Sequence, residues 1–488
     1  MMPSCTENLQ NWINSKKNIV ISDSYHIKED NWSTDPLVLH SYSQDLWPRK
    51  LLELRERGPA DPTVDLVIWP ETTQEVSGIV IWASKVDAMI CPYGAGSGVC
   101  GAVIPAANEK RLKVLIDLKK MHEVTKIDPV SMTVSAQTGI IGENLERALN
   151  QEGYTLGHFP SSIYCSTLGG YLAARSAGQF STKYGKIEDM VLSLEVVLPN
   201  GKVVETSRAP RSAMGPDWTQ LLLGSEGTLG VVTSATMQIH RLPEKKAFLS
   251  FSAKEISHAI HFARNLMQSG VRPAVIRIYD SLETSLTVSK DNLTSDHYEG
   301  GCVVVVLFEG ITDLVNAEEK AAKHIAQNYQ LRFMGPKMAE YWYVHRYDVS
   351  YKQQLILSHE KIVLDTFEIA ATWDRLEQVY HTVKKTQIGF GMILAHLSHF
   401  YHTGANIYFT LVGHGQTSQK TIPYYDQVWE KILQSAFDSG ATLSHHHGVG
   451  TQKMHWLNKE KGDLIEIYKK VKHGFDPENR FNANKMGC

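Results

Sequence analysis

The sequence predicts an α+β protein with more than one domain. Its 488 residues, 43% of them apolar, are enough to form more than one hydrophobic core. In both halves of the chain, segments with the two-residue alternation of strands are interspersed with segments that have the helical period. A glycine-rich stretch at residues 92–105 lies between two strand-like segments and is not followed by a helix.

The first predicted elements are a strand, a helix and a second strand that leads into the glycines. LVIWP at residues 66–70 is typical of a strand, and TTQE at 72–75 predicts a capping box at the start of a helix. The apolar stripe Val76, Ile79, Val80 and Ala83 has the spacing of one helical face. Residues 89–91 are expected to end the next strand.

The glycine stretch contains GSGVCG at residues 96–101, which fits the pattern G-x-G-x-x-G. A dinucleotide fingerprint of this kind requires a helix directly after the glycines, with its N-terminus facing the pyrophosphate. Here a polar turn and another strand, LKVLIDL at 112–118, follow instead. We therefore expect a loop whose bare main-chain N–H groups bind phosphate without a helix, with a ligand-free glycine turn as the alternative.

Further along, the predicted order is a strand, a helix, a hairpin and a second glycine loop. TVSAQTG at 133–139 alternates as a strand, and residues 144–152 have an apolar helical face that Gly153 can end. Residues 189–206 are predicted to form a hairpin that turns at Asn200 and Gly201. The second glycine loop begins at Gly224 and continues into a long strand.

Between residues 247 and 330, strands and helices alternate. AFLSF is followed by a helical stripe that starts at Ile256, then by AVIRIYD, CVVVVLF and a helix near 316–328. This order is typical of a ferredoxin-like α+β unit.

Charge and cysteine content exclude several classes of protein. The formal net charge is −3 and no dense basic arm is present, so nucleic-acid binding is not expected. The six cysteines are scattered, which indicates reduced thiols in a reducing compartment. The N-terminus lacks an apolar signal core, CVVVVLF is too short to cross a bilayer, and the C-terminal KMGC is not a peroxisomal address. We expect a cytoplasmic or peripheral protein.

Several motifs resemble a known family in order and spacing. PYGAGSGV (92–99), GHFPSSIYCSTLGGYLAARSAG (157–178), KYGKIEDMV (183–191) and LLGSEGTLGVVT (222–233) resemble the flavin domain of the vanillyl-alcohol-oxidase-type, FAD-linked oxidase superfamily. VVVLFEG (304–310), DTFEIAATWDRL (365–376), GANIYFTL (404–411) and LSHHHGVGTQKMHWL (443–457) are similar to alkylglycerone-phosphate synthases. The triple histidine before GVG is the most specific motif, because related 2-hydroxy-acid dehydrogenases usually have one histidine there.

The resemblance covers roughly residues 60 to 488 and implies a domain organisation. A helical segment at 1–60 precedes a two-subdomain FAD-binding domain of the vanillyl-alcohol-oxidase (PCMH) type at 61–243. An α+β, ferredoxin-like cap at 244–440 covers the flavin, and residues 441–488 pass back to the flavin site.

The resemblance also implies non-covalently bound FAD. The first loop has no histidine, and Cys165 does not fit the cysteine-linked pattern. Small residues allow the backbone to approach the diphosphate, and hydroxyls can bind it, although turn and cap roles are the alternative for the hydroxyls. The implied FAD contacts are Pro92, Tyr93, Gly94, Ala95, Gly96, Ser97, Gly98, Ser161, Ser162, Ser166, Thr167, Gly169, Gly170, Ala174, Arg175, Ser176, Ala177, Glu226, Gly227, Thr228, Leu229, Gly230, Val231 and Val232.

Tyr408 is the main catalytic candidate. A strand at 406–411 places Asn406, Tyr408 and Thr410 on a polar face, and Ile407, Phe409 and Leu411 on a core face. The resemblance implies that Tyr408 takes a proton from the substrate carbon that bears the acyloxy group. A phenol with a pKa of ~10 is a poor base, so we expect nearby histidines or the flavin to lower it. A packing role is the alternative.

His445, His446 and His447 are the other catalytic candidates. In an extended chain, His445 and His447 would share a face and His446 would oppose them. The resemblance implies that this cluster holds substrate or assists proton transfer. A metal site with His396 and His399 competes with this interpretation, but no carboxylate or cysteine ligand accompanies them, so no metal is predicted.

Two positions depart from the synthase pattern. Where the synthases carry an arginine ahead of the segment at 365–368, this chain has Gln353 or Gln354, and Asn200 replaces an arginine in the hairpin turn. Glutamine cannot form a charge-assisted fork to phosphate, which leaves Arg346, Lys352 or Lys361 as substitutes. Arg277 is retained and can be structural.

The function implied is an alkylglycerone-phosphate synthase-like step of ether-lipid synthesis. An acyl group on a glycerone phosphate would be exchanged for an alkyl group, with the flavin as an electrophile and no net redox change. The alternative is an FAD-linked oxidase or dehydrogenase of a 2-hydroxy acid or alcohol, and a third option is a flavin- or nucleotide-binding protein without catalysis. The expected partner is a lipid-like small molecule, with peripheral membrane contact and a homodimer left open.

Overall fold

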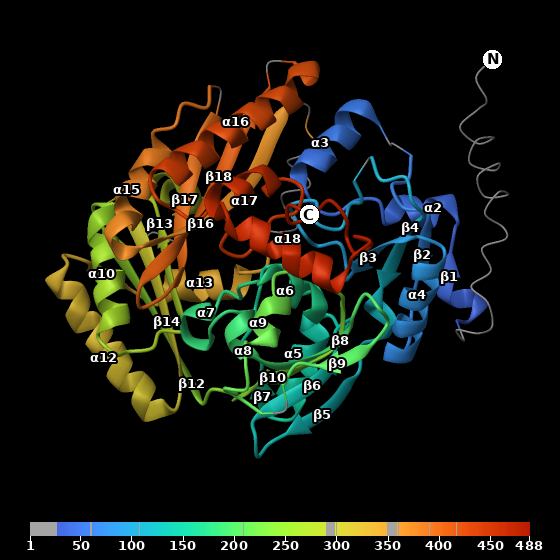
Figure 1. Cartoon of the computed structure of the whole chain (residues 1–488). Helices are drawn as coiled ribbons and strands as arrows, with labels where there is room; N and C mark the ends of the chain where they lie inside the picture. The colour runs from blue at the N-terminus through green and yellow to red at the C-terminus, as the bar shows by residue number, and fades with distance from the viewer. Residues whose placement is uncertain are drawn as a thin grey trace.

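Three β-sheets and a two-stranded ribbon support the part of the chain that is described, namely residues 27–58, 61–106, 108–207, 209–288, 298, 300–348, 359, 361–389, 391–415 and 417–488 of the computed structural model (Figure 1). The sheets have four, five and seven strands, and the ribbon pairs β7 (Tyr154–Thr155) with β11 (His240–Arg241). Each of the three larger sheets contributes residues to the candidate site described below.

The four-stranded sheet precedes and follows the first glycine loop. Its order is β1-β2-β4-β3, with β2, β4 and β3 parallel. The strands are β1 (Trp32–Ser33), β2 (Leu66–Ile68), β3 (Met89–Tyr93) and β4 (Lys113–Asp117), and α4 (Thr73–Lys85) connects β2 to β3. The glycines that follow β3 lead into β4 without a helix, which confirms the prediction.

The capping box predicted at the start of α4 is only half present. The Thr72 hydroxyl accepts a hydrogen bond from the Glu75 main-chain N–H at 3.1 Å, as expected for an N-cap. The Glu75 carboxylate, however, accepts from the N–H of Glu71 at 2.8 Å, one residue before the cap. In the standard motif this carboxylate would accept from the N–H of the N-cap residue, Thr72. Here it accepts from the residue before the N-cap.

The five-stranded sheet is antiparallel and has the order β5-β6-β10-β8-β9. Its strands are β5 (Val124–Asp128), β6 (Thr133–Gln137), β8 (Val191–Val197), β9 (Val203–Glu205) and β10 (Val231–Gln238), with helices α5 (Gly142–Gln151), α6 (Leu168–Ala174), α8 (Ile187–Met190) and α9 (Trp218–Leu222). The predicted hairpin is β8–β9, where Gly201 has a φ of 80°. Leu145 and Leu149 of α5 pack into the core beneath this sheet.

The seven-stranded sheet has the order β15-β12-β14-β13-β17-β18-β16. Its strands are β12 (Lys245–Ala253), β13 (Val275–Tyr279), β14 (Cys302–Gly310), β15 (Arg332–Gly335), β16 (Ile362–Thr372), β17 (Gly391–Phe400) and β18 (Gly404–His414). With α10 (Ile256–Gln268) and α12 (Thr312–Asn328), the first four strands form a βαββαβ unit whose strand order is that of a ferredoxin-like fold. The predicted pattern is confirmed, and three further antiparallel strands extend it.

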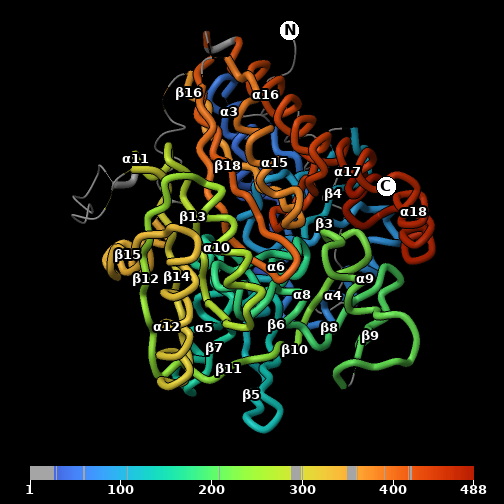
Figure 2. Tube along the Cα trace, turned by 90° about the vertical axis from the view of Figure 1, so that its left-hand side faces the viewer, coloured from blue at the N-terminus to red at the C-terminus, as the bar shows by residue number. Residues whose placement is uncertain are grey.

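Helices cover both faces of this sheet. One face packs against α10, α12, α15 (Trp373–Lys384) and α16 (Ser418–Asp438), which lie on the outside of the molecule (Figures 1 and 2). The other face packs against α7 (Ser181–Tyr184), α11 (Ser281–Val288) and α13 (Lys337–His345). Successive side chains of β14 point to opposite faces of the sheet. Val304 and Val306 therefore pack into the core beneath α10 and α12, and Val303 and Val305 into the core beneath α13.

Trp32 near the start of the described chain and Phe481 near its end pack into the core of the first sheet. Within the predicted N-terminal helical segment, α2 (Pro36–Ser41) and α3 (Pro48–Arg57) are present, while residues 1–26 and 59–60 lie outside the described residues. At the other end, α17 (Met454–Lys461) and α18 (Leu464–Phe475) cross the front of the molecule (Figure 1). The tail then pairs with β3, where Ile90 N–H donates to the Arg480 carbonyl at 2.8 Å.

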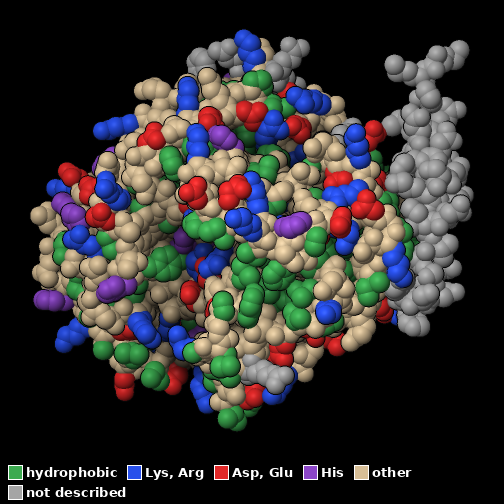
Figure 3. Space-filling view, in the orientation of Figure 1, with side chains coloured by type: hydrophobic (Ala, Val, Ile, Leu, Met, Phe, Trp, Pro, Cys, Tyr) green, Lys and Arg blue, Asp and Glu red, His purple; other side chains and the backbone are tan. Residues whose placement is uncertain are grey.

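The surface carries charges of both signs. On the face shown in Figure 3, Lys and Arg side chains are interspersed with Asp and Glu, without a continuous basic area. No helix of the described residues has the length and apolar character needed to span a bilayer.

Candidate functional site

Three loops predicted to bind the cofactor meet in space. The first glycine loop (residues 94–101) follows β3, the serine loop (residues 160–167) precedes α6, and the second glycine loop (residues 224–230) precedes β10. A Cβ at Gly94 would overlap the Thr167 hydroxyl, and one at Gly227 would lie 3.0 Å from Pro92. Small residues are therefore required because the three loops approach each other closely.

The first glycine loop has the free donors that a diphosphate needs. In the described part of the chain, no hydrogen bond is donated by the main-chain N–H groups of residues 95–99. Ala95 and Gly98 are exposed, whereas Tyr93 is buried. Gly96 has a φ of 65°, and a Cβ there would overlap the Tyr93 hydroxyl. The residues fit the backbone nest expected for a phosphate group.

The serine loop is largely held by its own hydrogen bonds. Thr167 is the N-cap of α6 and accepts from Gly170 N–H at 3.2 Å. The Ser166 hydroxyl donates to the Ser162 carbonyl at 2.7 Å, and Ser161 Oγ accepts from Gln179 Nε2 at 3.1 Å. These hydroxyls thus have the cap and turn roles that were the alternative to cofactor binding. A ligand would contact them only at the exposed edge of the loop.

The segment after α6 is also engaged. Arg175 adopts a left-handed conformation as the C-cap of α6 and its guanidinium contacts Gln220. Ser176 Oγ lies 2.8 Å from His158 Nε2, and Ala177 is buried. Ala174 packs near Gly448, where a Cβ on the glycine would lie 3.7 Å from it, and Gly169 packs against Thr138. These contacts place the segment between the serine loop and the residues that follow the triple histidine.

The second glycine loop contributes less to a cofactor surface than the resemblance implied. Leu229 and Val231 are fully buried in two different cores, and Gly230 lies against the Val197 carbonyl. The Thr228 hydroxyl donates to the Ser225 carbonyl at 2.7 Å. Their side chains therefore face the protein interior.

Glu226 has a role that the sequence did not indicate. It is buried, and its φ is 49°. Its carboxylate accepts from Val449 N–H at 2.6 Å and from Gly450 N–H at 2.9 Å. Burial raises the pKa of this carboxyl. Glu226 thus joins the second glycine loop to the residues that follow the triple histidine.

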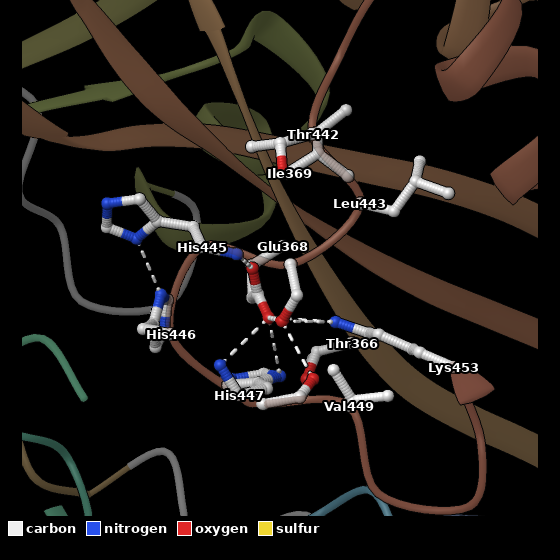
Figure 4. A network of polar contacts seen from close by, with 12 residues as sticks. Thr366, Glu368, Ile369, Thr442, Leu443, His445, His446, His447, Val449 and Lys453 are labelled. Carbon is white, nitrogen blue, oxygen red and sulfur yellow. Dashed lines mark hydrogen bonds and ion pairs between the residues drawn. The ribbon is translucent and has the colours of Figure 1, made fainter. Parts of the chain in front are cut away.

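The triple histidine lies in a bent segment, the histidine loop (residues 443–453), that is organised around Glu368 of β16 (Figure 4). The Glu368 carboxylate accepts from the main-chain N–H of His445 and, at 2.9 Å, from that of His447. Lys453 Nζ donates to it at 2.9 Å. The fully buried carboxylate is thus paired with a buried ammonium and with two loop amides.

The charge state of this pair follows from its contacts. Although burial raises the pKa of Glu368, Lys453, His447 and the loop amides outweigh it and lower the pKa to about 2. The pKa of Lys453 is raised because Glu368 outweighs its own burial. Both groups are therefore ionised, and the histidine loop is held by an internal ion pair.

The expectation that the three histidines follow an extended chain is wrong. Because His445 and His447 both donate their N–H groups to one carboxylate, the chain must bend between them. His446 and His447 therefore both lie near Tyr408, with ring centroids 6.2 and 5.7 Å away, whereas His445 contacts Tyr401 at 3.0 Å. The loop also packs on the first glycine loop, since Thr451 N–H donates to the Cys100 carbonyl at 2.8 Å.

Tyr408 is surrounded by the rings of His396, His446 and His447. Its ring is stacked on His396 at 4.8 Å with an interplanar angle of 17°, and its hydroxyl donates to Thr366 Oγ1 at 2.9 Å. As predicted, Ile407 and Phe409 are in the core. Asn406 is fully buried as well and donates to the Ile369 carbonyl, so it does not line a site.

The histidines do not lower the pKa of Tyr408, contrary to expectation. Burial raises the pKa of Tyr408 to about 12. Burial, with Lys186 nearby, lowers the pKa of His445 to about 3, and burial lowers that of His447 to about 4 and that of His446 well below its usual range. The phenol is protonated and the histidines are neutral at pH 7.

His396 is held in one tautomer by two charged neighbours. Arg277 Nη2 can only donate, so His396 Nε2 accepts from it at 2.8 Å. His396 Nδ1 then carries the proton and donates to Glu283 at 3.0 Å. Burial and Arg277 lower the pKa of His396. Arg277 therefore orients the ring that stacks beneath Tyr408.

A cavity of about 350 Å³ lies beside the serine loop. Among its lining residues, Arg346 has its guanidinium carbon 4.1 Å from the Tyr343 ring centroid and 4.3 Å from that of Tyr347. Its Nε is buried without a hydrogen-bond partner in the described part of the chain, where Arg346 also has no carboxylate partner. Gln179 connects the cavity to the serine loop, because Nε2 donates both to Ser161 Oγ and to the Arg346 carbonyl.

Of the three cationic residues that could replace the missing arginines, the structure describes Arg346 and Lys361. Lys352, Gln353 and Gln354 lie outside the described residues. Asn200 uses its side-chain oxygen locally, accepting from Lys202 N–H at 3.0 Å. Lys361 lies directly before β16, and its carbonyl accepts from Gly415 N–H. Arg346 is the candidate that lines a cavity, with its Nη1 donating to the Tyr343 carbonyl.

A metal site would need ligands that the histidine loop does not offer. Within the described ranges, no group of three or more His, Cys, Asp and Glu side chains is arranged to hold a metal ion. None of the cysteines that the structure describes is part of a disulfide.

Sequence reasoning did not identify Glu368, Lys453 or Tyr401, and it gave Glu226 only as an implied FAD contact. A weak signal existed for Glu368, since a carboxylate in the strand LDTFEIAA is unusual unless it is paired. No pattern pointed to Tyr401, whose contact with His445 joins residues 44 positions apart.

Comparison with known proteins agrees with this arrangement of loops. Residues 64–207 match the FAD binding domain family, and residues 242–486 match the family of the C-terminal domain of FAD linked oxidases. The chain belongs to the FAD-linked oxidase family, and its predicted cofactor class is confirmed as FAD.

Within that family, the chain is similar to alkyldihydroxyacetonephosphate synthases. It is 32% identical to the Dictyostelium discoideum alkyldihydroxyacetonephosphate synthase over 476 residues, which cover 92% of this chain and 77% of the relative. A solved structure of an alkyldihydroxyacetonephosphate synthase superposes with a TM-score of 0.80 at 28% identity, covering 98% of this chain and 85% of the other.

More distant relatives show the breadth of the family. The mitochondrial D-lactate dehydrogenase [cytochrome] of Arabidopsis thaliana is 26% identical over 480 residues, which are 96% of this chain and 80% of the relative. The structure of p-cresol methylhydroxylase superposes with a TM-score of 0.73 at 15% identity over 99% of this chain and 97% of the other, a likeness that shows the fold alone. The predicted vanillyl-alcohol-oxidase-type α+β fold is confirmed.

Proposed function

We propose that this protein is an FAD-dependent alkyltransferase that exchanges the acyl group of an acylated glycerone phosphate for an alkyl group. The observation that carries the proposal is the similarity to alkyldihydroxyacetonephosphate synthases over about nine tenths of the chain, including the triple-histidine segment. The structure supports it by placing that segment against Tyr408 and against both glycine loops.

Bound FAD would supply an electrophilic ring and an electron sink, and this chain supplies binding and proton handling. The free N–H groups of residues 95–99 are suited to the diphosphate. At pH 7, Tyr408 is a protonated phenol next to neutral imidazoles, which are the nearest groups able to accept its proton. Tyr408 can then accept a proton from a substrate carbon only after it has lost its own proton, which a positive charge or a favourable dipole in the loaded site would promote.

Recognition of an anionic headgroup is proposed to depend on Arg346. Its guanidinium lines the cavity, has no carboxylate partner in the described residues and is oriented by stacking between two tyrosine rings and by the bond from Nη1 to the Tyr343 carbonyl. Arg346→Lys keeps the charge but loses the planar fork. We expect it to raise KM for a phosphorylated substrate by about tenfold or more, since each 1.4 kcal/mol is a factor of ten.

An anaerobic titration tests the reaction class. Release of fatty acid from an acylated glycerone phosphate, with the yellow flavin unbleached, is the expected result. Bleaching by a 2-hydroxy acid without acyl release would contradict the transferase and support the second candidate. That candidate is a flavin dehydrogenase, favoured by the similarity to D-lactate dehydrogenase and by Gln353 and Gln354 at the expected arginine position.

The finer assignments are also proposals. We infer that FAD is bound without a covalent link, so that acid precipitation releases all of the yellow chromophore from the protein. We likewise propose domain limits near residues 60, 243 and 440, the individual FAD contacts given above and a cytoplasmic location.

A further inference from the structure

We propose that Tyr401 and His445 set the tautomer of His446 and are positioning residues for a hydrogen-bond donor at the reaction centre. The observation is a chain of side chains in contact. Tyr401 Oη lies 3.0 Å from His445 Nε2, and His445 Nδ1 lies 2.9 Å from His446 Nδ1 (Figure 4 shows the second contact).

The ring contacts do not hold the loop in place. Glu368 accepts from the main-chain N–H groups of His445 and His447 and is itself held by Lys453. Glu226 fixes the end of the loop through Gly450. The ring contacts are therefore free to serve another purpose, and removal of the Tyr401 hydroxyl leaves the backbone supports intact.

Each imidazole in this chain is neutral and has one donor and one acceptor nitrogen. His445 uses both nitrogens, one towards Tyr401 and one towards His446. Because two Nδ1 atoms face each other, one ring must donate and the other must accept. The tautomers of His445 and His446 are therefore coupled, and the direction of the Tyr401 contact decides both.

The surroundings of Tyr401 decide that direction. Burial keeps this tyrosine protonated by raising the pKa of its hydroxyl, which Ser181 also contacts. Ser181 Oγ lies 2.7 Å from His399 Nδ1 as well. When His399 carries its proton on Nδ1 and donates it to Ser181, the Ser181 hydroxyl donates to the phenol oxygen. With Ser181 as a donor, His445 Nε2 is the acceptor left in the described residues for the phenol proton, and the proposal includes this arrangement. Tyr401 therefore donates to His445, whose Nδ1–H donates to His446.

The consequence is that His446 carries its proton on Nε2. No hydrogen bond of this nitrogen is present among the residues that the structure describes, and the His446 ring is nearly parallel to that of Tyr408, at 19°. It is therefore available to a bound molecule as a neutral N–H donor, as in sites where a neutral imidazole polarises an oxygen. Under the proposed function, on which this last step rests, its acceptor is the oxygen of the departing carboxylate.

Tyr401→Phe tests the chain. The first measurement is ¹⁵N NMR of histidine side chains in the FAD-loaded protein, with the His446 signals assigned by their loss in His446→Gln. We expect wild-type His446 to carry its proton on Nε2, and Tyr401→Phe to populate both tautomers. A wild-type proton on Nδ1, or an unchanged tautomer in Tyr401→Phe, would overturn the proposal.

Kinetics provides the second measurement, with whichever substrate the enzyme turns over. We expect Tyr401→Phe to lower kcat by about 10- to 100-fold with little change in KM, which is part of the 10²–10⁴ that a positioned proton group supplies. The double variant Tyr401→Phe/His446→Gln should be no slower than His446→Gln alone, because the two act together. Independent, multiplying effects would contradict the coupling.

A matched control separates this role from loss of a buried hydroxyl. Tyr380 on α15 is also buried and its hydroxyl donates to Asp280 at 3.3 Å. Tyr380→Phe should leave kcat and the His446 tautomer unchanged. The NMR measurement needs no substrate, so the proposed reaction can fail while the tautomer result still stands.

Discussion

Glu368→Gln tests whether the buried ion pair holds the histidine loop. The substitution keeps the size of the side chain but removes the charge that faces Lys453, whose Nζ lies 2.9 Å from the carboxylate. Both side chains are almost completely buried, so Lys453 would remain as a buried ammonium without a carboxylate. The two loop amides would also lose an anionic acceptor.

Two routes give the size of the effect. Breaking a buried pair by removing one partner costs about 3–5 kcal/mol of unfolding free energy. The lowered pKa of Glu368, about 2 against an ordinary value of ~4.3, corresponds to roughly 3 kcal/mol at 1.36 kcal/mol per pKa unit. The expected loss is therefore about 3 kcal/mol or more.

Urea unfolding of the FAD-loaded protein is the assay. With an m-value of ~3 kcal/mol/M, a loss of 3 kcal/mol lowers the midpoint by about 1 M. The double variant Glu368→Gln/Lys453→Met removes both charges and should recover much of the loss, because neither partner is then left unpaired. The control is Glu466→Gln, which removes an exposed ion pair with Lys469 on α18.

The reasoning fails if Glu368→Gln unfolds at the wild-type midpoint, or if adding Lys453→Met lowers the midpoint further. The first result would mean that the carboxylate is not ionised in the folded state. The second would mean that Lys453 stabilises the loop by contacts other than this pair. A change in the Glu466→Gln control would indicate a general effect of lost charge.

Three further outcomes are expected. Tyr408→Phe should retain bound FAD and lose turnover, and normal rates in a yellow variant would exclude a catalytic role. Gly96→Val should abolish FAD binding, because its φ of 65° disfavours valine and a Cβ would overlap the Tyr93 hydroxyl; a fully yellow variant would show the loop to be misplaced. Stability should fall as the pH drops from 6.5 towards 4, because the unfolded chain protonates its histidines there while His445 (pKa about 3) and His447 (pKa about 4) stay neutral; a urea midpoint that is constant over this range would contradict these lowered pKa values.

Much of the fold could be predicted because the signals are local. The strand–helix–strand order that precedes Gly94 depends on contiguous apolar patterns and on the Thr72 cap. The βαββαβ unit likewise has its six elements in chain order, and its period changes from two to 3.6 at each helix. The pairing of β17 with β13 joins segments more than a hundred residues apart and has no such signal.

The site was predicted less completely because its geometry depends on distant partners. The sequence pointed to Tyr408 and to the three histidines, but treated the histidine loop as an extended chain. The bend is produced by a carboxylate 77 and 79 positions away in the sequence, which binds two amides of the loop. A local pattern cannot show this, because the loop itself contains no acidic residue.

The distribution of charge explains why the protein without ligands does not lower the pKa of Tyr408 as expected. The Glu368–Lys453 pair is internally neutral, and the histidines around Tyr408 are neutral because they are buried. Burial raises the pKa of the phenol to about 12 and the Asp365 and Glu368 carboxylates add to the rise, although Thr366 and Arg277 oppose it. A bound molecule lowers this pKa only if it brings a positive charge, a hydrogen-bond donor or a favourable dipole to the phenol oxygen, because displacing water acts in the opposite direction. Proton transfer from a substrate carbon to Tyr408 is thus expected only once a bound molecule has lowered this pKa.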